Sequence, residues 1–563
     1  MSRPFRSARR MFFSKAYRPH RLAVAASAVA VSVVTYSSLK NRPIQNDSLP
    51  PRSFKSEYVS EKLEGSVPNS GRDSLNTLVW GSNNSQKLLP KIEGPASQVL
   101  RSPTPAKWLH NVALRDIAFH KEYAAAIDAR GNVYQWGHGA EEPSCILKGK
   151  KNIREIRLTN SKIYALSTSG NIFALSADRA SHLNPATSTP WPTGWLWGGK
   201  NFGNFQEITP NTPLDRGEKF VSISAGQDHL LGLTSNGRAF AHPLNRNANA
   251  YGQLGFRKFD APDPSVQTKA RIPVELVPKS VIDPFSRASP FKRSNLTPNP
   301  EQATIHIDLP FCPNVFEIPS LKGINLSKVV AGGRSSFALT STGRVLAWGA
   351  NEYGQLGLGD SVTLDTITVP TEVILWRMAS SGTQTRCLDV FAGGDLTCFI
   401  VERARQVTAQ RSTSIEVLLS GNGQNGSLGN NLYTNVQGSP VRARNISNLS
   451  EYDDVTNSLK PIAPDSVSVS PTGHVLLALK SAVGCDLLAW GRNYDSELGN
   501  GKRSGLPSPT TLSAPDGGRL IMRRKKAKEV LDLEGKVWKR GVEVEQKAVA
   551  GHNCSAVFWK SHK

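Results

Sequence analysis

The chain has 563 residues and a formal net charge of +23 at pH 7, of which +10 lies in residues 1–56. Such a basic balance permits contact with nucleic acid or an anionic lipid surface but does not by itself select either. Six cysteines without C-x-x-C spacing argue against a zinc site or a redox pair. The sequence also lacks H-E-x-x-H and G-x-S-x-G, which argues against a zinc protease and an esterase.

The N-terminal 46 residues contain no Asp or Glu, whereas the first 21 carry seven Arg and Lys side chains among Ser, Ala and Phe. This composition is typical of a mitochondrial presequence, so residues 1–21 are predicted to direct import. Residues 22–39 carry no charge over eighteen positions, at the short end of what crosses ~30 Å of hydrocarbon. We expect a transmembrane helix there, in the mitochondrial inner membrane, followed by a linker over 40–75.

Two alternatives to the transmembrane helix stay open. Residues 22–39 are rich in Ala and Ser and could be only a hydrophobic part of the presequence. A secretory signal fits less well, because its charged region would be unusually long.

A repeated pair of strands follows, and its clearest copy runs from Lys328 to Gly359. It consists of an apolar strand ending in Ala-Gly-Gly, the strand SSFALT, the turn STGR, the strand VLAWG and a Gly-rich loop. Weaker copies of the first half begin near Ile117, Ile156, Val221, Leu388, Val467 and Lys547. Copies of the second half lie at Trp80, Trp136, Phe173, Phe240, Trp348, Leu419 and Trp490.

The repeats are divided between the two ends of the chain. The first landmark is a lone second half at 78–81, and the last is a lone first half at 547–559. A hairpin unit cannot bury its own apolar face, and radial stacking of four-stranded units gives a β-propeller. The sequence therefore predicts an all-β fold over 76–562. We expect a seven-bladed β-propeller closed by pairing of N- and C-terminal strands, preceded by a presequence and a single apolar helix.

The residue types of the repeat fit this geometry. Small residues such as Gly332 suit a strand near the central axis, where only a short side chain fits. Gly354 and Gly357 permit turns with positive φ. A Trp such as Trp348 would fill the space between adjacent blades. The predicted structural repeat positions are Trp80, Trp136, Trp348, Trp490, Gly332, Gly354, Gly357 and Gly551.

The pattern resembles the regulator-of-chromosome-condensation repeat family, seven-bladed propellers whose repeat reads roughly A-G-x-x-H-x-x-A-L…G-x-V-x-x-W-G-x-N-x-x-G-Q-L-G. The residues that carry the resemblance are 331–359, 225–229 with 251–255, 489–493 with 498–499, 426–429 and 550–552. His229 and His552 are expected at the same repeat position. We interpret a histidine there as a buried hydrogen-bonding residue of the blade rather than a ligand or base.

Three segments interrupt the repeats, at 178–217, 256–320 and 430–465. The second is rich in proline and has little apolar periodicity, so we expect a long loop on one rim, either a binding loop or a disordered segment. The basic run RRKKAK at 523–528 is expected to be an exposed insertion rather than a nuclear import signal or a phosphate-binding loop.

Two Gly-rich runs resemble phosphate-binding loops. Residues 194–201 nearly match G-x-x-x-x-G-K-[ST], but Asn201 has no hydroxyl to bind magnesium. Their second part, 197–201, fits W-G-x-N and is an alternative to 173–176 as a blade strand. Residues 421–430 follow a blade strand and are expected to be the turn of the repeat. We therefore expect no cofactor, no metal and no enzymatic activity.

The resemblance leaves two main kinds of function. The first is a scaffold that binds client proteins. Mitochondrial members of the family are associated with assembly of respiratory-chain complexes or with mitochondrial ribosomes, and a membrane-anchored fungal-type member resembles an assembly factor for complex III. The second is guanine-nucleotide exchange on a Ras-like GTPase, with Asp228 and His229 as candidate interaction residues. No hairpin wedge that would displace nucleotide is recognisable. We favour the scaffold, with no small-molecule substrate and with ribosome or RNA contact as a further alternative.

Overall fold

A computed structural model of the chain describes residues 74–90, 98–137, 140–178, 205–262, 271–282, 312–407 and 410–561. The predicted presequence (1–21), the predicted transmembrane helix (22–39) and nearly all of the predicted linker (40–75) lie outside these residues. Among the described residues, no helix has both the length and the apolar character needed to cross a membrane.

Strands dominate the described residues, which confirms the prediction of an all-β fold. They pair mainly in antiparallel ladders of four, which we call blades 1 to 7 in chain order of their first strands. Blade 1 consists of β3 (Leu114–Phe119), β4 (Tyr123–Asp128), β5 (Val133–Gly137) and β6 (Ala140–Leu147). Blade 2 consists of β7 (Ile153–Leu158), β8 (Lys162–Ser167), β9 (Ile172–Ser176) and β10 (Phe205–Pro210). Blade 3 consists of β11 (Phe220–Ala225), β12 (His229–Thr234), β13 (Ala239–Pro243) and β16 (Asn314–Glu317).

The remaining blades follow the same order of pairing. Blade 4 consists of β17 (Leu326–Ala331), β18 (Ser335–Thr340), β19 (Val345–Ala350) and β20 (Thr366–Glu372), and blade 5 of β21 (Thr383–Gly393), β22 (Leu396–Val407), β23 (Gln410–Gly423) and β24 (Thr434–Arg442). Blade 6 consists of β27 (Pro464–Val469), β28 (His474–Lys480), β29 (Cys485–Gly491) and β30 (Leu506–Thr511). Blade 7 consists of β33 (Val537–Gly551), β34 (Cys554–Ser561), β1 (Leu78–Ser82) and β2 (Val99–Pro105).

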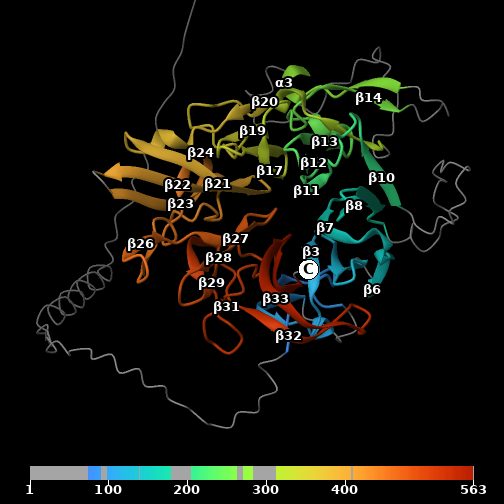
Figure 1. Cartoon of the computed structure of the whole chain (residues 1–563), viewed down its shortest axis with the longest axis vertical. Coiled ribbons are helices and arrows are strands. Elements are labelled where there is room, and N and C mark those ends of the chain that lie inside the picture. The colour runs from blue at the N-terminus through green and yellow to red at the C-terminus, as the bar shows by residue number, and fades with distance from the viewer. Residues whose placement is uncertain are drawn as a thin grey trace, which may run out of the picture. The chain divides into compact units, whose positions relative to one another are not determined.

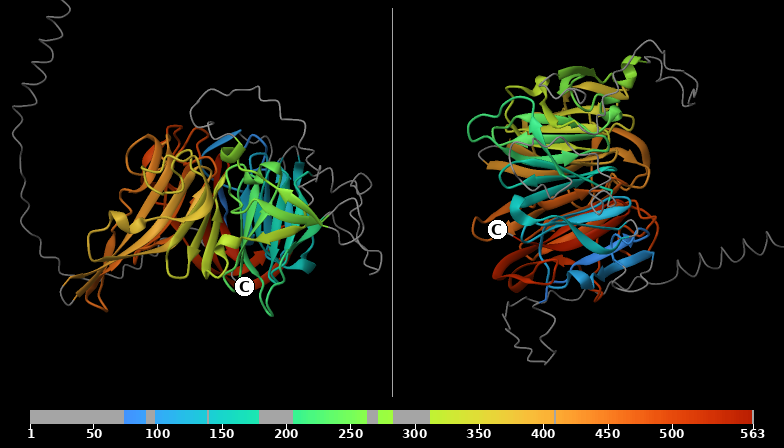
Figure 2. Two further views of the ribbon diagram at one scale, coloured as in Figure 1. Left: turned by 90° about the horizontal axis from the view of Figure 1, so that it is seen from above. Right: turned by 90° about the vertical axis from the view of Figure 1, so that its right-hand side faces the viewer.

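The first strand of every blade lies near a common axis. Figure 1 places β3, β7, β11, β17, β21, β27 and β33 nearest the middle of the ring. Each of these strands contacts the next, and β33 contacts β3. The views in Figure 2 show the strands of neighbouring blades stacked side by side, running between the two faces of the ring.

Blade 7 combines the two ends of the described chain. β1 pairs antiparallel with β34, and the register sets Leu78 opposite Val557 and Gly81 opposite Cys554. The lone second half at 78–81 and the lone first half at 547–559 therefore lie in one ladder.

The outer strands of three blades lie inside segments that the sequence assigned to insertions. β10 lies within 178–217, β16 within 256–320 and β24 within 430–465. The interpretation of 256–320 as a loop without strands is therefore wrong, since it also holds the hairpin β14 (Lys258–Pro262) and β15 (Arg271–Glu275) and the short helix α3 (Lys279–Ile282). Outer strands contain proline, which lacks an N–H but is tolerated at a sheet edge. Examples are Pro103, Pro210, Pro370, Pro440 and Pro507.

Apolar side chains gather between neighbouring blades. Trp348 of blade 4 packs with Leu231 and Ala241 of blade 3, and Phe399 of blade 5 packs with Phe337 of blade 4. The core is thus divided among the blade interfaces, as stacking of hairpin units requires.

The basic run 523–528 is not a free loop. Most of it forms β32 (Arg524–Leu531), which pairs antiparallel with the first half of β33. Ala527 and Val530 are buried, while the side chains of Arg524 and Lys526 are exposed. The expectation of an exposed insertion is therefore only partly right, because alternate residues of a strand face opposite sides.

Candidate functional site

The turns between first and second strands and the Gly-rich loops after third strands lie on one face of the propeller, which we call the Gly-rich face. This placement follows from the antiparallel order of each blade. Backbone hydrogen bonds join successive turns on it, from the Gln227 N–H to the Gly333 carbonyl and from the Gly333 N–H to the Gly394 carbonyl. The Gly-rich face includes turns 226–228, 332–334, 393–395, 471–473 and 551–553 and loops 245–255, 351–359, 422–433 and 493–505.

The four predicted tryptophans are buried, and each ties its blade to the preceding one. Each indole Nε1 donates a hydrogen bond to a backbone carbonyl in the loop of the preceding blade. The pairs are Trp80 to Glu497 (2.7 Å), Trp136 to Lys87 (2.8 Å), Trp348 to Gln253 (2.9 Å) and Trp490 to Ser427 (2.8 Å). An indole has one polar group, so this bond satisfies it while its ring fills the interface.

The predicted glycines lie where a side chain would meet backbone or a packed neighbour. Gly354 has a φ of +72°, and a Cβ there would lie 2.5 Å from the Cα of Gly438. Gly357 also has a φ of +72° and lies against Phe399. A Cβ on Gly551 would lie 2.5 Å from the Cβ of Phe119 in blade 1.

Gly332 lies at the inner end of blade 4. A Cβ there would lie 2.5 Å from the Oγ of Ser335, and its carbonyl-side neighbour Gly333 lies against Gly394 of the next blade. Glycine at these positions thus permits the close approach of inner turns on the Gly-rich face.

His229 is fully buried, and its Nε2 lies 2.9 Å from the Oγ of Ser336 in blade 4. The Ser336 hydroxyl donates in turn to the Gln253 carbonyl (2.7 Å). Burial lowers the pKa of His229 to about 3. A neutral imidazole sealed between two blades serves their packing and is not placed to receive a partner protein.

The same arrangement recurs at His474, which the sequence did not single out. Its Nε2 lies 3.0 Å from the Oγ of Ser555, whose hydroxyl donates to the Glu497 carbonyl (2.8 Å). Burial, and secondarily the charge of Arg492, lowers the pKa of His474 to about 3. The sequence analysis missed it because Ser470 and Pro471 stand where the repeat has Ala-Gly.

The expectation that His229 and His552 share a repeat position is wrong. β12 begins at His229, whereas β34 begins two residues after His552, at Cys554. His552 instead lines a central cavity of about 690 Å³ formed by the first strands of the blades. Burial and the nearby Lys87 ammonium lower the pKa of His552 to about 4.

Asp228, the other candidate interaction residue, is half-buried on the Gly-rich face. Its Oδ1 accepts a 2.7 Å hydrogen bond from the Nδ2 of Asn245 in the Gly-rich loop of the same blade. Asp228 and His229 are therefore adjacent in sequence but point to different environments, and they do not form one polar patch.

Two clusters of charged and aromatic side chains stand on the Gly-rich face. In the first, Arg334 pairs with Glu352 (2.6 Å) and lies 3.7 Å from Asp395. The Arg334 guanidinium lies 4.6 Å from the ring centroid of Tyr251 and donates to its hydroxyl. The Tyr251 hydroxyl donates to Glu352 (3.0 Å), so the four side chains are held as a unit.

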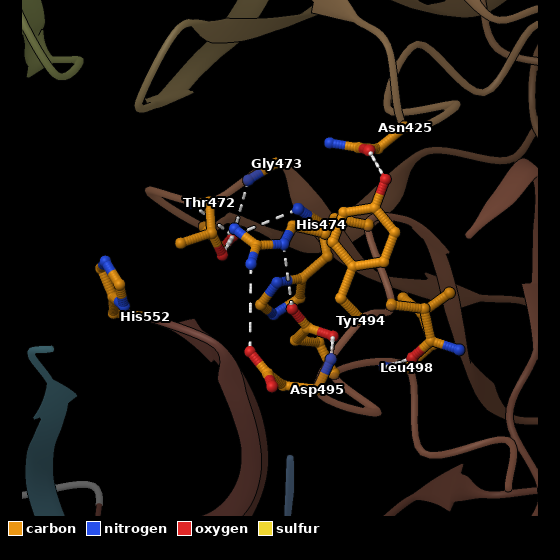
Figure 3. Close-up of polar contacts among 12 residues, drawn as sticks. Asn425, Thr472, Gly473, His474, Tyr494, Asp495, Leu498 and His552 are labelled. Atoms are coloured by element: carbon orange, nitrogen blue, oxygen red, sulfur yellow. Dashed lines mark hydrogen bonds and ion pairs between the residues drawn. The ribbon is translucent and has the colours of Figure 1, made fainter. Parts of the chain in front are cut away.

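The second cluster has the same composition at the loop after β29. Arg492 lies 3.4 Å from Glu497 and 3.9 Å from Asp495, and its guanidinium lies 5.3 Å from the Tyr494 ring centroid. The Tyr494 hydroxyl donates to Asn425 in the loop of the preceding blade (2.9 Å), as Figure 3 shows. Tyr494 is 58% exposed, which leaves its ring accessible from solvent.

Sequence reasoning missed both clusters. Their residues occupy the variable positions of the repeat, in A-G-G-R-S around Arg334 and W-G-R-N-Y around Arg492. An Arg adjoining an aromatic residue and an acid in these loops would have been the only sequence indication.

The other sequence expectations are placed as follows. Residues 421–430 form the end of β23 and the loop after it, while 194–201 lie outside the described residues. β9 forms at Ile172–Ser176, so 173–176 is a blade strand. In the described part of the chain, no group of three or more His, Cys, Asp or Glu side chains is placed to hold a metal ion, and the six cysteines are free thiols.

The geometry defines a β-propeller, and comparison with known proteins agrees with this fold. Residues 342–400 match the Regulator of chromosome condensation (RCC1) repeat, and residues 326–355 match a second description of it. The chain therefore carries RCC1 repeats, which confirms the resemblance.

Two relatives are mitochondrial proteins. The chain is 22% identical over 454 residues to Protein FMP25, mitochondrial, of Saccharomyces cerevisiae, covering 77% of this chain and 65% of that protein. It is 45% identical over 56 residues to RCC1 domain-containing protein RUG3, mitochondrial, of Arabidopsis thaliana, covering 10% of this chain and 12% of that protein. The chain thus spans just under two thirds of the length of FMP25 and a short part of RUG3.

Among solved structures, the fold is similar to that of Prp20p from Saccharomyces cerevisiae, described together with its binding properties to Gsp1p and histones. The TM-score is 0.51 at 14% identity, and the match covers 87% of this chain and 93% of that one. At this identity the likeness is one of fold.

Proposed function

We propose that the protein is a non-enzymatic mitochondrial scaffold whose propeller binds client proteins through the Gly-rich face. The observation that carries this proposal is the pair of clusters built around Arg334 and Arg492. Aromatic and Arg side chains are enriched at protein interfaces, and these are preordered by their own ion pairs and hydrogen bonds. The mitochondrial relatives and the acid-free basic N-terminus support the compartment.

We further infer a closed seven-bladed ring, anchored in the inner membrane by residues 22–39. The pairing of β1 with β34 and the contact of β33 with β3 support closure. The uncharged run 22–39 supports the anchor. Alkaline carbonate extraction of mitochondria tests the anchor, because full-length protein should stay in the membrane pellet. Its release into the supernatant would remove the anchor from the proposal.

The proposed client is a protein of respiratory-chain complex III, whose assembly the scaffold would support. The test is affinity purification from detergent-solubilised mitochondria, comparing the wild type with an Arg334→Gln/Arg492→Gln variant. Complex III subunits should co-purify with the wild type and be reduced at least several-fold with the variant. Ribosomal proteins in their place would favour the ribosome alternative.

A matched control removes two ion-paired arginines from the opposite face, as Arg344→Gln/Arg519→Gln. These pair with Glu372 (3.7 Å) and Asp486 (3.3 Å) and are largely exposed. Client recovery should be unchanged with this control. If the first variant unfolds at a lower temperature, Tyr494→Ala tests the same face through an exposed side chain. Equal recovery with all variants would overturn the assignment of the Gly-rich face.

Guanine-nucleotide exchange is the second candidate, favoured by the fold it shares with Prp20p. The burial of His229 weighs against it, because an exchange surface needs polar groups that reach the partner. An Asp228→Ala variant should keep client recovery and respiratory growth. A Ras-like GTPase co-purifying with the wild type but not with this variant would favour exchange.

A further inference from the structure

A second cavity opens on the face opposite the Gly-rich face, and we call it the basic pocket. It has a volume of about 630 Å³ and lies where β3, β7 and β11 begin and β34 ends. The basic side chains that line it are Arg115, Arg154, Arg157, Lys219 and Lys560. Blades 1, 2, 3 and 7 thus bring together five cations from positions far apart in the sequence.

The acidic side chains in the basic pocket do not balance this charge. Asp116 and Glu155 are its two carboxylates, and both pair with Arg157, at 3.4 Å and 2.5 Å. Within the part of the chain that the structure describes, none of the other four cations forms an ion pair. The basic pocket therefore carries a formal surplus of three positive charges (five cations, two carboxylates) around a hollow.

Arg115 is held rigidly at the wall of the basic pocket. Its Nε donates to the Ala129 carbonyl (3.1 Å), and its Nη1 donates to the Ile153 carbonyl (2.9 Å) and to Asn152. Burial lowers its pKa, although Asp128 works in the opposite direction. A fixed, partly desolvated guanidinium without a carboxylate partner would be stabilised by an anion entering the pocket.

One wall of the basic pocket is aromatic. Trp538 stands on the first half of β33, in the hairpin that β33 forms with β32. This hairpin is held over blade 1 by the Arg130–Asp532 ion pair (2.7 Å) and a hydrogen bond from Arg130 to the Val537 carbonyl (3.0 Å). Cations beside a flat aromatic surface are the combination that recognises a phosphate attached to a stacking group.

We propose that the basic pocket binds a phosphate-bearing small molecule of nucleotide size. Its volume lies in the range of ligand pockets, which is ~300–1,000 Å³. Arg115, Arg154, Lys219 and Lys560 contact the phosphates, and Trp538 packs against the base or another flat group of the ligand. The pocket lies apart from the Gly-rich face, so this binding is independent of the proposed client site.

The test measures binding of pyrophosphate and of ATP without magnesium to the full-length detergent-solubilised protein by calorimetry at low and high salt. Both anions should bind, more weakly as salt rises, because charge pairs are screened. A Lys219→Gln/Lys560→Gln variant should raise the Kd for both at least tenfold. A Lys502→Gln/Arg503→Gln variant, which removes the same charge from an exposed loop of blade 6, should leave both Kd values unchanged.

A Trp538→Leu variant separates the two parts of the ligand. It should weaken ATP binding several-fold and leave pyrophosphate binding unchanged. If the variant binds both anions as tightly as the wild type does, the site recognises only the phosphates and Trp538 has no role in binding. If the double lysine variant melts at a lower temperature than the wild type, Arg154→Gln replaces it, since Arg154 is exposed.

Three results would overturn the proposal. The first is that the wild type binds neither anion at low salt. The second is that the variants in the basic pocket and the control variant show the same rise in Kd. Alternatively, hexaglutamate would bind in competition with pyrophosphate and more tightly than ATP, which would assign the basic pocket to an acidic peptide.

Discussion

The indole Nε1 of Trp80 donates a 2.7 Å hydrogen bond to the backbone carbonyl of Glu497, 417 positions later in the chain. Trp80 lies on β1 in blade 7, and Glu497 lies in the Gly-rich loop of blade 6. The same carbonyl accepts from the Oγ of Ser555 on β34, the strand that pairs with β1. One backbone oxygen thus receives donors from the first and last described strands.

Removing residues 547–563 should therefore abolish cooperative unfolding. The deletion takes away β34 and most of the part of β33 that pairs with it, so the edge of β1 is exposed and β3 loses its bridge from Leu114 to Lys560. Unpaired edges promote aggregation, so we expect a broad transition and insoluble protein. Thermal unfolding followed by circular dichroism, with light scattering, measures both. Trimming residues 57–70 is the control, and a C-terminal deletion with unchanged stability would argue against ring closure.

Trp348→Ala should lower the free energy of unfolding by about 3–5 kcal/mol, as for other buried aromatic residues. The indole is fully buried, packs between blades 3 and 4 and loses its hydrogen bond to Gln253 when truncated. Urea unfolding measures the change. Trp376→Ala is the matched control, because Trp376 is 60% exposed, and its loss should be within ~0.5 kcal/mol of zero. Similar losses for both variants would contradict the interblade role.

Gly354→Ala and Gly501→Ala separate backbone strain from steric contact. Both glycines have positive φ, +72° and +75°. The left-handed conformation alone should therefore lower the free energy of unfolding of each Ala variant by about 1–2 kcal/mol. A Cβ at Gly354 also meets the backbone of Gly438 at 2.5 Å, whereas one at Gly501 meets nothing within 4 Å. Overpacking should add a further ~1–3 kcal/mol at Gly354 only. Equal losses in urea unfolding would mean that the two loops can separate freely.

The sequence predicted positions that recur in several blades. Trp348 and Trp490 fill the space between blades, and Gly354 has a positive φ. Each position favours one residue type, so the spacing of these residues in the sequence predicts the fold. The outer strand β24 was not predicted, because it is partly exposed, contains Pro440 and lacks a regular alternation of apolar residues. Such strands form because a partner strand supplies hydrogen bonds, which a local pattern does not reveal.

The candidate site was less predictable for a related reason. The sequence analysis interpreted His229 as a buried hydrogen-bonding residue and also offered it as a candidate interaction residue. The structure agrees with the burial, but the residue that seals His229 is Ser336 of the next blade, 107 positions away, and the repeat pattern does not identify it. The ion pair of Arg334 with Glu352 depends on the meeting of a turn and a loop. Contacts of this kind arise from blade stacking, whereas a repeat pattern gives only the positions that all blades share.

His229 and His474 should make the protein unstable in mild acid. Their folded-state pKa values are about 3, below the ordinary value of 6.5, so the unfolded state binds protons first as the pH falls. The stabilisation is complete above pH 6.5 and is lost progressively as the pH falls toward 3. At pH 5 each histidine should lower the free energy of unfolding by ~2 kcal/mol relative to pH 7.5. Urea unfolding at the two pH values measures this loss.

Replacing either histidine with Gln should reduce this pH dependence by ~2 kcal/mol, because the residue that gains a proton on unfolding is gone. His110→Gln is the control for the substitution itself, since the His110 side chain is exposed. The His229→Gln substitution also alters the contact with Ser336, so it changes the stability at every pH. The change in the free energy of unfolding between pH 7.5 and pH 5 therefore measures the effect of protonation alone. An unchanged difference in both variants would mean that the acid sensitivity arises elsewhere, for example at His552.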